Sequence, residues 1–393
     1  MLAETLFKLI RNEIFGEEIT VEKEKFSTDV LRDLYKLSKS HDVAHLLSDA
    51  IIKNGLMDTD CSVYKLFIKQ QQLAVSRYER INYELKSLTE IFEKEKIPFM
   101  PLKGSVLRKF YPEPWMRTSC DIDILINEEN LERATDALVN KYGYEKTIEW
   151  DHDVSFMSAS GVHLELHYNF IEYKSRDPEM NERIWKDAIL SEGYEYRYEM
   201  TDVTYYYYHV AHMAKHFESG GCGIRPFIDF AIMKQNIPVD EEQLSLVLSQ
   251  TKLNEFYNGC LKLYNVWFES GEHDQLTKEM EKFILRAGVY GNIENRVAVI
   301  KSTKSQGKFR YLMYKIFLPY ELLSVIYPKL KKRRYLTPFY EVRRWFEILF
   351  CGRMKNAVRE IKVNANTGAE QVQKVSNLMK ELGLETAIKI DDK

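Results

Sequence analysis

Two aspartates, Asp121 and Asp123, stand two residues apart at the start of the apolar run Ile124-Leu125-Ile126. Residues two apart on a β-strand point to the same face, so a strand here places two carboxylates side by side. Close carboxylates repel each other unless a cation lies between them. Mg²⁺ takes hard oxygen ligands and is commonly shared between carboxylates and substrate phosphates, so the spacing predicts a magnesium site.

Upstream, Lys103-Gly104-Ser105 follows a short apolar run bounded by Pro98 and Pro101. Gly104 allows a tight backbone turn. Ser105 offers a hydroxyl and a backbone N–H at the start of a predicted helix, where the helix dipole favours phosphate. We therefore expect this turn to bind phosphate.

The segment His163-Leu164-Glu165-Leu166-His167 supplies a third carboxylate. Strand alternation places the two leucines on an apolar face and the other three side chains on the opposite face. Glu165 could complete the metal site. His163 and His167 could assist its proton chemistry, because histidine titrates near neutral pH, or they could equally be exposed sheet residues.

His209, His212 and His216 lie at i, i+3 and i+7 of a predicted helix and so share one helix face. They could bind zinc or line a nucleotide pocket. Histidines without a nearby cysteine ligand more often pack or hydrogen-bond, which makes zinc the weaker interpretation. The nearby Arg225 and Asp229 could form a local ion pair.

The elements that position these residues follow from the spacing of apolar side chains. Strand, helix, strand, helix and a hairpin around Ala159-Ser160-Gly161 imply a small mixed α/β sheet, and the chain beyond Thr201 is again mostly helical. The predicted helices cover about 30–56, 64–96, 105–110 and 128–142, and the predicted strands cover 97–102, 121–126, 154–158 and 162–168.

Composition bounds the class of protein. A chain of 393 residues with 45% hydrophobic content can bury a substantial core and is expected to form two or more structural units. A net charge of -3 and a mean hydropathy of -0.39 exclude a disordered or strongly nucleic-acid-seeking chain. The five cysteines form no CxxC pair, which argues against a zinc ribbon or a disulfide framework. Without a signal peptide or a bilayer-spanning stretch, we expect a cytoplasmic protein.

A basic and aromatic segment covers 301–360, where 15 Lys or Arg face four Glu. This composition could bind RNA, because cations bind phosphates and aromatic rings stack on bases. The spacing of Leu322, Ile326 and Leu330 favours instead amphipathic helices whose aromatic residues pack and whose cations face solvent. The run Lys329 to Arg334 could still contact an acidic acceptor or a membrane surface.

The glycine-serine turn, the Asp-x-Asp strand and the later carboxylate strand together resemble the DNA polymerase β-like nucleotidyltransferase superfamily. The resemblance is strongest to its uncharacterised bacterial nucleotidyltransferase branch and covers about 97–346. It is carried by Pro101-Leu102-Lys103-Gly104-Ser105, Tyr111-Pro112, Arg117, the Asp121 to Ile126 strand, the histidine-rich helix with Arg225 and Asp229, Leu318-Pro319-Tyr320 and Tyr327-Pro328.

The resemblance implies roles for particular residues. Asp121, Asp123 and Glu165 would be catalytic metal ligands, and Glu165 would also orient or deprotonate the acceptor hydroxyl. The remaining candidates would bind the nucleotide: Gly104 and Ser105 at the triphosphate, Lys103 as a point charge, Arg117 as a bidentate phosphate ligand, and His209, His212 or Lys215 near the substrate. Fifteen residues separate Ser105 from Asp121, more than is common in the superfamily, so an inserted loop is expected.

The function implied is that of a Mg²⁺-dependent nucleotidyltransferase that binds ATP or another nucleoside triphosphate, with two magnesium ions when the nucleotide is bound. An acceptor hydroxyl or phosphate attacks the α-phosphorus in line and pyrophosphate leaves. A small-molecule acceptor is expected rather than nucleic acid. The alternatives are an inactive nucleotide-binding or regulatory protein, an RNA-associated protein, and a toxin that modifies tRNA or a protein.

The expected fold class is α+β, with a polymerase β-like mixed-sheet core flanked by helical regions. We expect a helical N-terminal region at 1–92 and the α/β catalytic domain at 93–200. A helical C-terminal region at 201–393, which includes the basic segment 301–360, would close over the nucleotide cleft.

Overall fold

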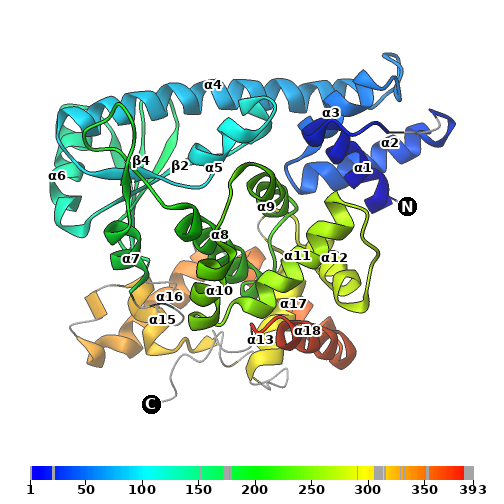
Figure 1. Cartoon of the computed structure of the whole chain (residues 1–393). Coiled ribbons are helices and arrows are strands. Elements are labelled where there is room, and N and C mark those ends of the chain that lie inside the picture. The colour runs from blue at the N-terminus through cyan, green and yellow to red at the C-terminus, as the bar shows by residue number, and fades with distance from the viewer. Residues whose placement is uncertain are drawn as a thin grey trace.

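A computed structural model gives the arrangement of the chain (Figure 1). It describes residues 2–19, 23–150, 152–170, 177, 179–289, 291–304, 313, 316–327, 329–330, 333–350 and 354–384. Within these residues a mixed sheet lies among many helices, which agrees with the expected α+β class. No helix in the described part of the chain is both long and apolar enough to cross a bilayer.

The central sheet has five strands in the order β1-β2-β5-β4-β3. β2 and β5 pair in parallel, and the other neighbours are antiparallel, so the sheet is mixed as expected. β4 and β5 form the predicted hairpin. The strands are β1 Phe99–Pro101, β2 Asp121–Ile126, β3 Glu145–Glu149, β4 Asp153–Met157 and β5 His163–His167.

One face of the sheet packs against two helices, α4 (Tyr64–Lys94) and α6 (Leu131–Asp136). The alternate side chains of β2 and β5, such as Ile122 and Leu164, are fully buried in this layer together with Leu88 of α4. Figure 1 shows α4 running along this side of the sheet. Because strand side chains alternate, the remaining residues of β2 and β5 point to the opposite face.

The opposite face of the sheet looks toward α8 (Asp202–Glu218) and α9 (Arg225–Asn236) (Figure 1). Leu125 of β2 belongs to the same core cluster as apolar residues of α8 and α9, including Tyr208. The sheet therefore has a mainly apolar side under α4 and a second side on which Asp121, Asp123 and Glu165 face the helical region.

Helices from both ends of the sequence share that second core. The N-terminal helices α1 (Leu2–Phe15), α2 (Thr28–Ser40) and α3 (Ala44–Lys53) pack into the same cluster as α11 (Asn254–Phe268). The ring of Phe7 stacks on Trp267 with centroids 4.1 Å apart. The helices before the sheet and those after it are thus joined by direct packing.

The other elements are short or lie toward the C-terminus, and a small ribbon of β6 (Ile189–Leu190) and β7 (Tyr198–Glu199) lies at the β1 edge. The remaining helices are α5 Gly104–Leu107, α7 Met180–Lys186, α10 Glu241–Gln250, α12 Gln275–Ala287, α13 Ile293–Lys304, α15 Tyr320–Ile326, α16 Thr337–Phe350, α17 Met354–Asn366 and α18 Ala369–Glu381.

The structure differs from the predicted elements in several places, among them these three. The helix expected over 30–56 is two helices, because Asp42 adopts φ 54° between α2 and α3. The helix expected over 128–142 is divided into a 3₁₀ turn, α6 and a π-helical turn over Ala137–Lys141. β3 was not predicted, because all five of its side chains are exposed and it lacks apolar alternation.

The basic and aromatic segment is only partly described: 305–312, 314–315, 328, 331–332 and 351–353 lie outside the described residues, including the aromatic Tyr311 and Tyr314. Tyr327 and Tyr340 are buried against each other, as the packing interpretation predicts. Phe339 and Phe346, in contrast, are 65% and 56% exposed, so packing does not account for every aromatic residue of this segment.

Four cysteines are free thiols in the described part of the chain, namely Cys61, Cys120, Cys222 and Cys260. Cys351 lies outside the described residues.

Candidate active site

The two aspartates lie on the side of β2 that faces away from α4. Their neighbours Ile122 and Ile124 are fully buried under α4, and alternation turns Asp121 and Asp123 toward the helical region. Asp123 is 5% exposed, whereas Asp121 at the strand end is half-buried. The sequence prediction of two carboxylates on one face is consistent with this geometry.

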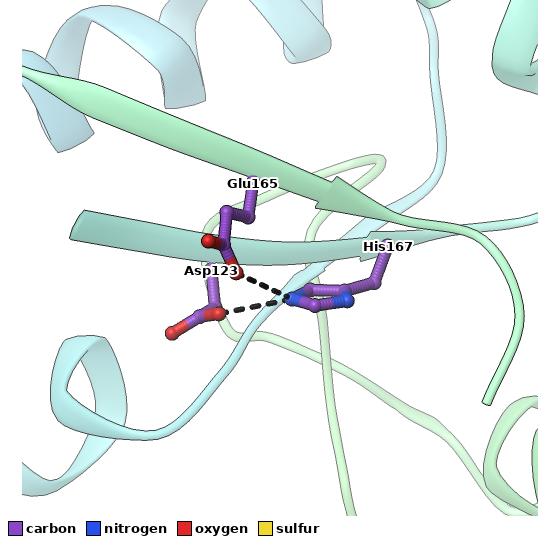
Figure 2. Close-up of side chains that lie close together, drawn as sticks. All are labelled: Asp123, Glu165 and His167. Atoms are coloured by element: carbon purple, nitrogen blue, oxygen red, sulfur yellow. Dashed lines mark hydrogen bonds and ion pairs between the residues drawn. The ribbon is translucent and has the colours of Figure 1, made fainter. Parts of the chain in front are cut away.

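Glu165 lies directly opposite Asp123, because β2 and β5 pair in parallel with these two residues in register. Two residues along the same face of β5, the His167 ring reaches both carboxylates. Its Nε2 is 2.9 Å from Oδ1 of Asp123 and 3.6 Å from Oε2 of Glu165 (Figure 2). These three side chains bring together potential metal-ligating atoms.

The environment of the carboxylates shifts their pKa values in opposite directions. Burial alone would raise the pKa of Asp123, but the charge of Lys103 and the hydrogen bond from His167 outweigh it and hold the pKa well below its usual value. Burial, followed by the charge of Asp123, raises the pKa of Glu165 to about 7. Asp123 is therefore the permanent anion of the group, and Glu165 exchanges a proton near neutral pH.

The Lys103 turn is attached to the same carboxylate. Nζ of Lys103 lies 2.8 Å from Oδ1 of Asp123, and the backbone N–H of Leu102 donates to the carbonyl of Asp123 at 3.0 Å. Lys103 has φ 48° and ψ -120°, the first central position of a type II′ turn that usually takes glycine. A residue held in such a conformation costs about 1–3 kcal/mol and is typical of functional sites.

The contacts of Ser105 differ from the expected ones. Its backbone N–H donates to the carbonyl of Leu102 at 3.1 Å and closes the turn, so this group is used internally. The helix that follows, α5, is only four residues long, which leaves it a weak dipole. The backbone N–H of Ser105 is therefore not available to a phosphate, although Ser105 does line the cavity described below.

Arg117 has a structural partner that the sequence did not reveal. Its Nε donates to both oxygens of Asp229, at 2.7 and 3.0 Å, and Nη1 donates to the carbonyl of Thr118. The Tyr111 hydroxyl donates to the same carboxylate at 2.7 Å. Burial would lower the pKa of Arg117, but the charge of Asp229 outweighs it, so the guanidinium is a permanent cation. The loop between Ser105 and Asp121 thus docks on α9, and a phosphate contact of Arg117 stays a prediction.

Gly104 lies against this ion pair. A Cβ atom at Gly104 would come within 3.2 Å of Nη1 and 3.4 Å of Cζ of Arg117. The glycine therefore allows the Lys103 turn to rest on the guanidinium.

The local ion pair considered for Arg225 and Asp229 is not formed. Arg225 instead lies 3.1 Å from Oδ2 of Asp42, the residue between α2 and α3, while Asp229 binds Arg117. Arg225 is the first residue of α9 and Asp229 lies one turn further along the helix, but the two side chains pair with different neighbours.

The three histidines of α8 lie near one another, as their spacing predicts. Nε2 of His209 is 2.9 Å from the carbonyl of Pro226, and Nε2 of His212 is 3.1 Å from Nε2 of His216. Burial lowers the pKa of both His209 and His212, so these rings are neutral near pH 7. They act as hydrogen-bonding groups rather than as cations.

A cavity of about 220 Å³ lies between the N-terminal end of β2, the Lys103 turn, α8 and α9. Glu165 and Lys215 are not part of its lining: Glu165 lies beside Asp123 on β5, and Lys215 lies on α8. The predicted site residues that line the cavity are Lys103, Gly104, Ser105, Arg117, Asp121, Asp123, His209 and His212.

Other lining residues had no sequence signal, and three of them come from segments outside the predicted site. His41 directly follows α2, Gly223 lies between α8 and α9, and Val289 follows α12. A Cβ atom at Gly223 would meet Cα of Val289 at 3.1 Å and Nδ1 of His41 at 3.3 Å, so the glycine allows these segments to approach. Burial lowers the pKa of His41 to about 4 and keeps the ring neutral. Only tertiary packing brings such distant segments to one cavity.

Comparison with protein families gives a match to the family described as "Uncharacterised nucleotidyltransferase" over residues 29–269. The chain belongs to this family. The nucleotidyltransferase match includes the whole sheet and all of α8 and α9, and hence every predicted site residue. The chain matches no curated protein and no solved structure.

Proposed function

We propose that the protein is a magnesium-dependent enzyme that transfers a nucleoside monophosphate from a nucleoside triphosphate to a small acceptor, on a polymerase β-like core. The observation that carries the proposal is the register of β2 and β5. It sets Glu165 opposite Asp123, next to a cavity bordered by the strained Lys103 turn. Family membership supports nucleotidyl transfer as the reaction type.

The carboxylates fit magnesium by their chemistry. Asp121, Asp123 and Glu165 offer hard oxygen ligands on one side of the sheet, and Asp123 is buried as an anion beside the ammonium of Lys103. Asp121, Asp123 and Glu165 would hold the metal. Bound magnesium would supply positive charge to the phosphates as charge develops on them.

The triphosphate is bound, in this proposal, at the turn of Lys103, Gly104 and Ser105. Lys103 supplies a point charge, and Ser105 donates from its hydroxyl. Arg117, paired with Asp229, lies behind Gly104 and supports this turn.

The transfer step forms a bond between an acceptor oxygen and the α-phosphorus and breaks the bond from that phosphorus to pyrophosphate, which leaves. The acceptor proton goes to Glu165, which the parallel register of β2 and β5 places beside Asp123. Its Oε2 faces His167, and its Oε1 lies 3.8 Å from Nδ1 of His163. Oε1 is thus the oxygen that we assign to proton transfer.

The cavity favours a small, polar and uncharged acceptor group. Its volume of about 220 Å³ lies below the roughly 300–1,000 Å³ of typical ligand pockets, so the acceptor group that enters it is small. The neutral rings of His209 and His212 on its α8 wall can hydrogen-bond hydroxyl groups. A sugar-like alcohol fits this wall better than an anionic acceptor.

The test is transfer of radiolabel from α-³²P-labelled nucleoside triphosphates, with magnesium and a panel of small polyols and sugars. The wild type should release pyrophosphate and label an acceptor, and Asp121→Asn/Asp123→Asn should lose at least about 100-fold in rate. Asp29→Asn/Asp33→Asn, which removes two exposed carboxylates of α2 that each pair locally, serves as the control and should keep full activity. Equal activity in the site variant and the wild type would refute the proposal, as would magnesium-dependent binding without pyrophosphate release.

A further inference from the structure

His167 is the one member of the Figure 2 group that the proposed reaction does not use. We propose that its Nε2 is a direct ligand of the active-site metal, together with Asp123 and Glu165. At equal concentrations of the two ions, this ligand set binds Mn²⁺ more tightly than Mg²⁺. The inference rests on the proposed function, because it concerns the metal of that same site.

The spacing of the three ligand atoms suits a shared ion. Nε2 of His167 is 2.9 Å from Oδ1 of Asp123 and 3.6 Å from Oε2 of Glu165. Ligand atoms that surround one ion at about 2.0–2.2 Å lie roughly 3 Å apart in an octahedron and roughly 3.4 Å apart in a tetrahedron. The observed separations bracket these values.

The His167 ring is held in this orientation before any ligand arrives. It is nearly parallel to the ring of Phe170, with centroids 6.2 Å apart, and it is buried. In the described part of the chain, its Nδ1 has no hydrogen-bond partner. Ligation through Nε2 would place the ring proton on Nδ1, and the metal would replace the contact that Nε2 makes with Asp123.

The neighbouring histidine gives the contrast. His163 lies on the same face of β5, but its nearest carboxylate contact is Nδ1 to Oε1 of Glu165 at 3.8 Å. It is in register with Asp121 rather than Asp123 and is more exposed than His167. The geometry thus assigns ligation to one histidine of this strand and not to the other.

The chemistry of an imidazole ligand determines which metal the site prefers. Carboxylate and water ligands suit both Mg²⁺ and Mn²⁺, whereas an imidazole nitrogen suits transition metals. An imidazole added to the carboxylates of the site therefore distinguishes Mn²⁺ from Mg²⁺, which the carboxylates alone do not.

The experiment is electron spin echo spectroscopy of the nucleotide-free, full-length protein loaded with Mn²⁺. Direct ligation predicts modulation from a coordinated imidazole nitrogen, which changes to the ¹⁵N pattern when the histidines are ¹⁵N-labelled. His167→Gln should abolish the modulation and weaken Mn²⁺ binding by about tenfold or more, while Mg²⁺ binding changes less. His163→Gln should keep both the modulation and the affinity.

Absence of nitrogen coupling in the wild type overturns the inference, and so does coupling that persists in a folded His167→Gln variant. The isotope experiment needs no variant, so it remains decisive if His167→Gln fails to fold. Nitrogen coupling without nucleotidyl transfer would leave the ligand assignment in place and refute the proposed function. Transfer with Mg²⁺ but without nitrogen coupling would refute the ligand assignment and leave the proposed function in place.

Discussion

Arg117 and Asp229 are oppositely charged residues that both lie almost fully buried beneath the Lys103 turn. Their charges compensate each other, and Asp229 also accepts the Tyr111 hydroxyl. Gly104 rests on the guanidinium, so this pair supports the turn at which we place the triphosphate.

At the residue scale, we expect Asp229→Asn to lower the free energy of unfolding by about 3–5 kcal/mol, because it leaves the Arg117 charge buried without a counterion. Urea denaturation at pH 7 measures this loss. Arg117→Met/Asp229→Leu removes both charges and should cost less than Asp229→Asn alone. The single variants Arg117→Met and Asp229→Leu are measured beside it. If the double variant loses as much unfolding free energy as these two lose in sum, this explanation is wrong.

At the scale of elements, α1 and α3 meet at a pair of acids, the buried Glu13 and the half-buried Asp49. Burial, followed by the hydrogen bond and charge of Asp49, raises the pKa of Glu13 from 4.5 to about 8, against a smaller opposing effect of Lys53. Oε2 of Glu13 has no hydrogen-bond partner among the described residues. Glu13 is therefore protonated in the folded protein at neutral pH.

The sign of the pH effect follows from these values. Between pH 4.5 and about 8, the unfolded chain releases the Glu13 proton while the folded chain keeps it, so the free energy of unfolding falls as pH rises. The fall is on the order of a few kcal/mol. Glu13→Gln should remove it, which urea titrations of both proteins at pH 5 and pH 8 can measure. The same pH dependence in both proteins would show that Glu13 is ionised in the folded state.

At the scale of the whole molecule, the helices before and after the sheet form one core. Phe7 of α1 stacks on Trp267 of α11, and both belong to the cluster that includes residues of α8 and α9. The cavity is lined by residues from α8, α9 and the end of α2. Assembly of the candidate site therefore depends on the packing of all three regions.

We expect Phe7→Ala to cost about 3–5 kcal/mol and to move a single cooperative thermal transition that includes both helical regions. Calorimetry and limited proteolysis at increasing temperature follow the two regions separately. Leu2→Ala, on the same helix but at an exposed position, is the matched control and should change little. Two transitions, of which only the first is shifted by Phe7→Ala, would show that residues 1–92 fold as an independent unit.

The sequence itself determined the features that depend on local backbone geometry. The two-residue period of a strand put Asp121 and Asp123 on one face and Glu165 on the polar face of β5, and the helical period put His209, His212 and His216 together. The hairpin around Gly161 was likewise predictable, because glycine readily adopts the positive φ that such a turn needs. Gly161 has φ 75° in the structure. These features depend only on residues that lie close together in the sequence.

Tertiary structure alone decided which distant residues meet. The parallel register that sets Glu165 opposite Asp123, the pairing of Arg117 with Asp229 and of Arg225 with Asp42, and the place of His41 in the cavity join elements far apart in the chain. Such contacts depend on how the layers pack around two cores, and no local period encodes that packing. The chain thus encodes its reactive groups locally, and the fold sets the partners that tune them.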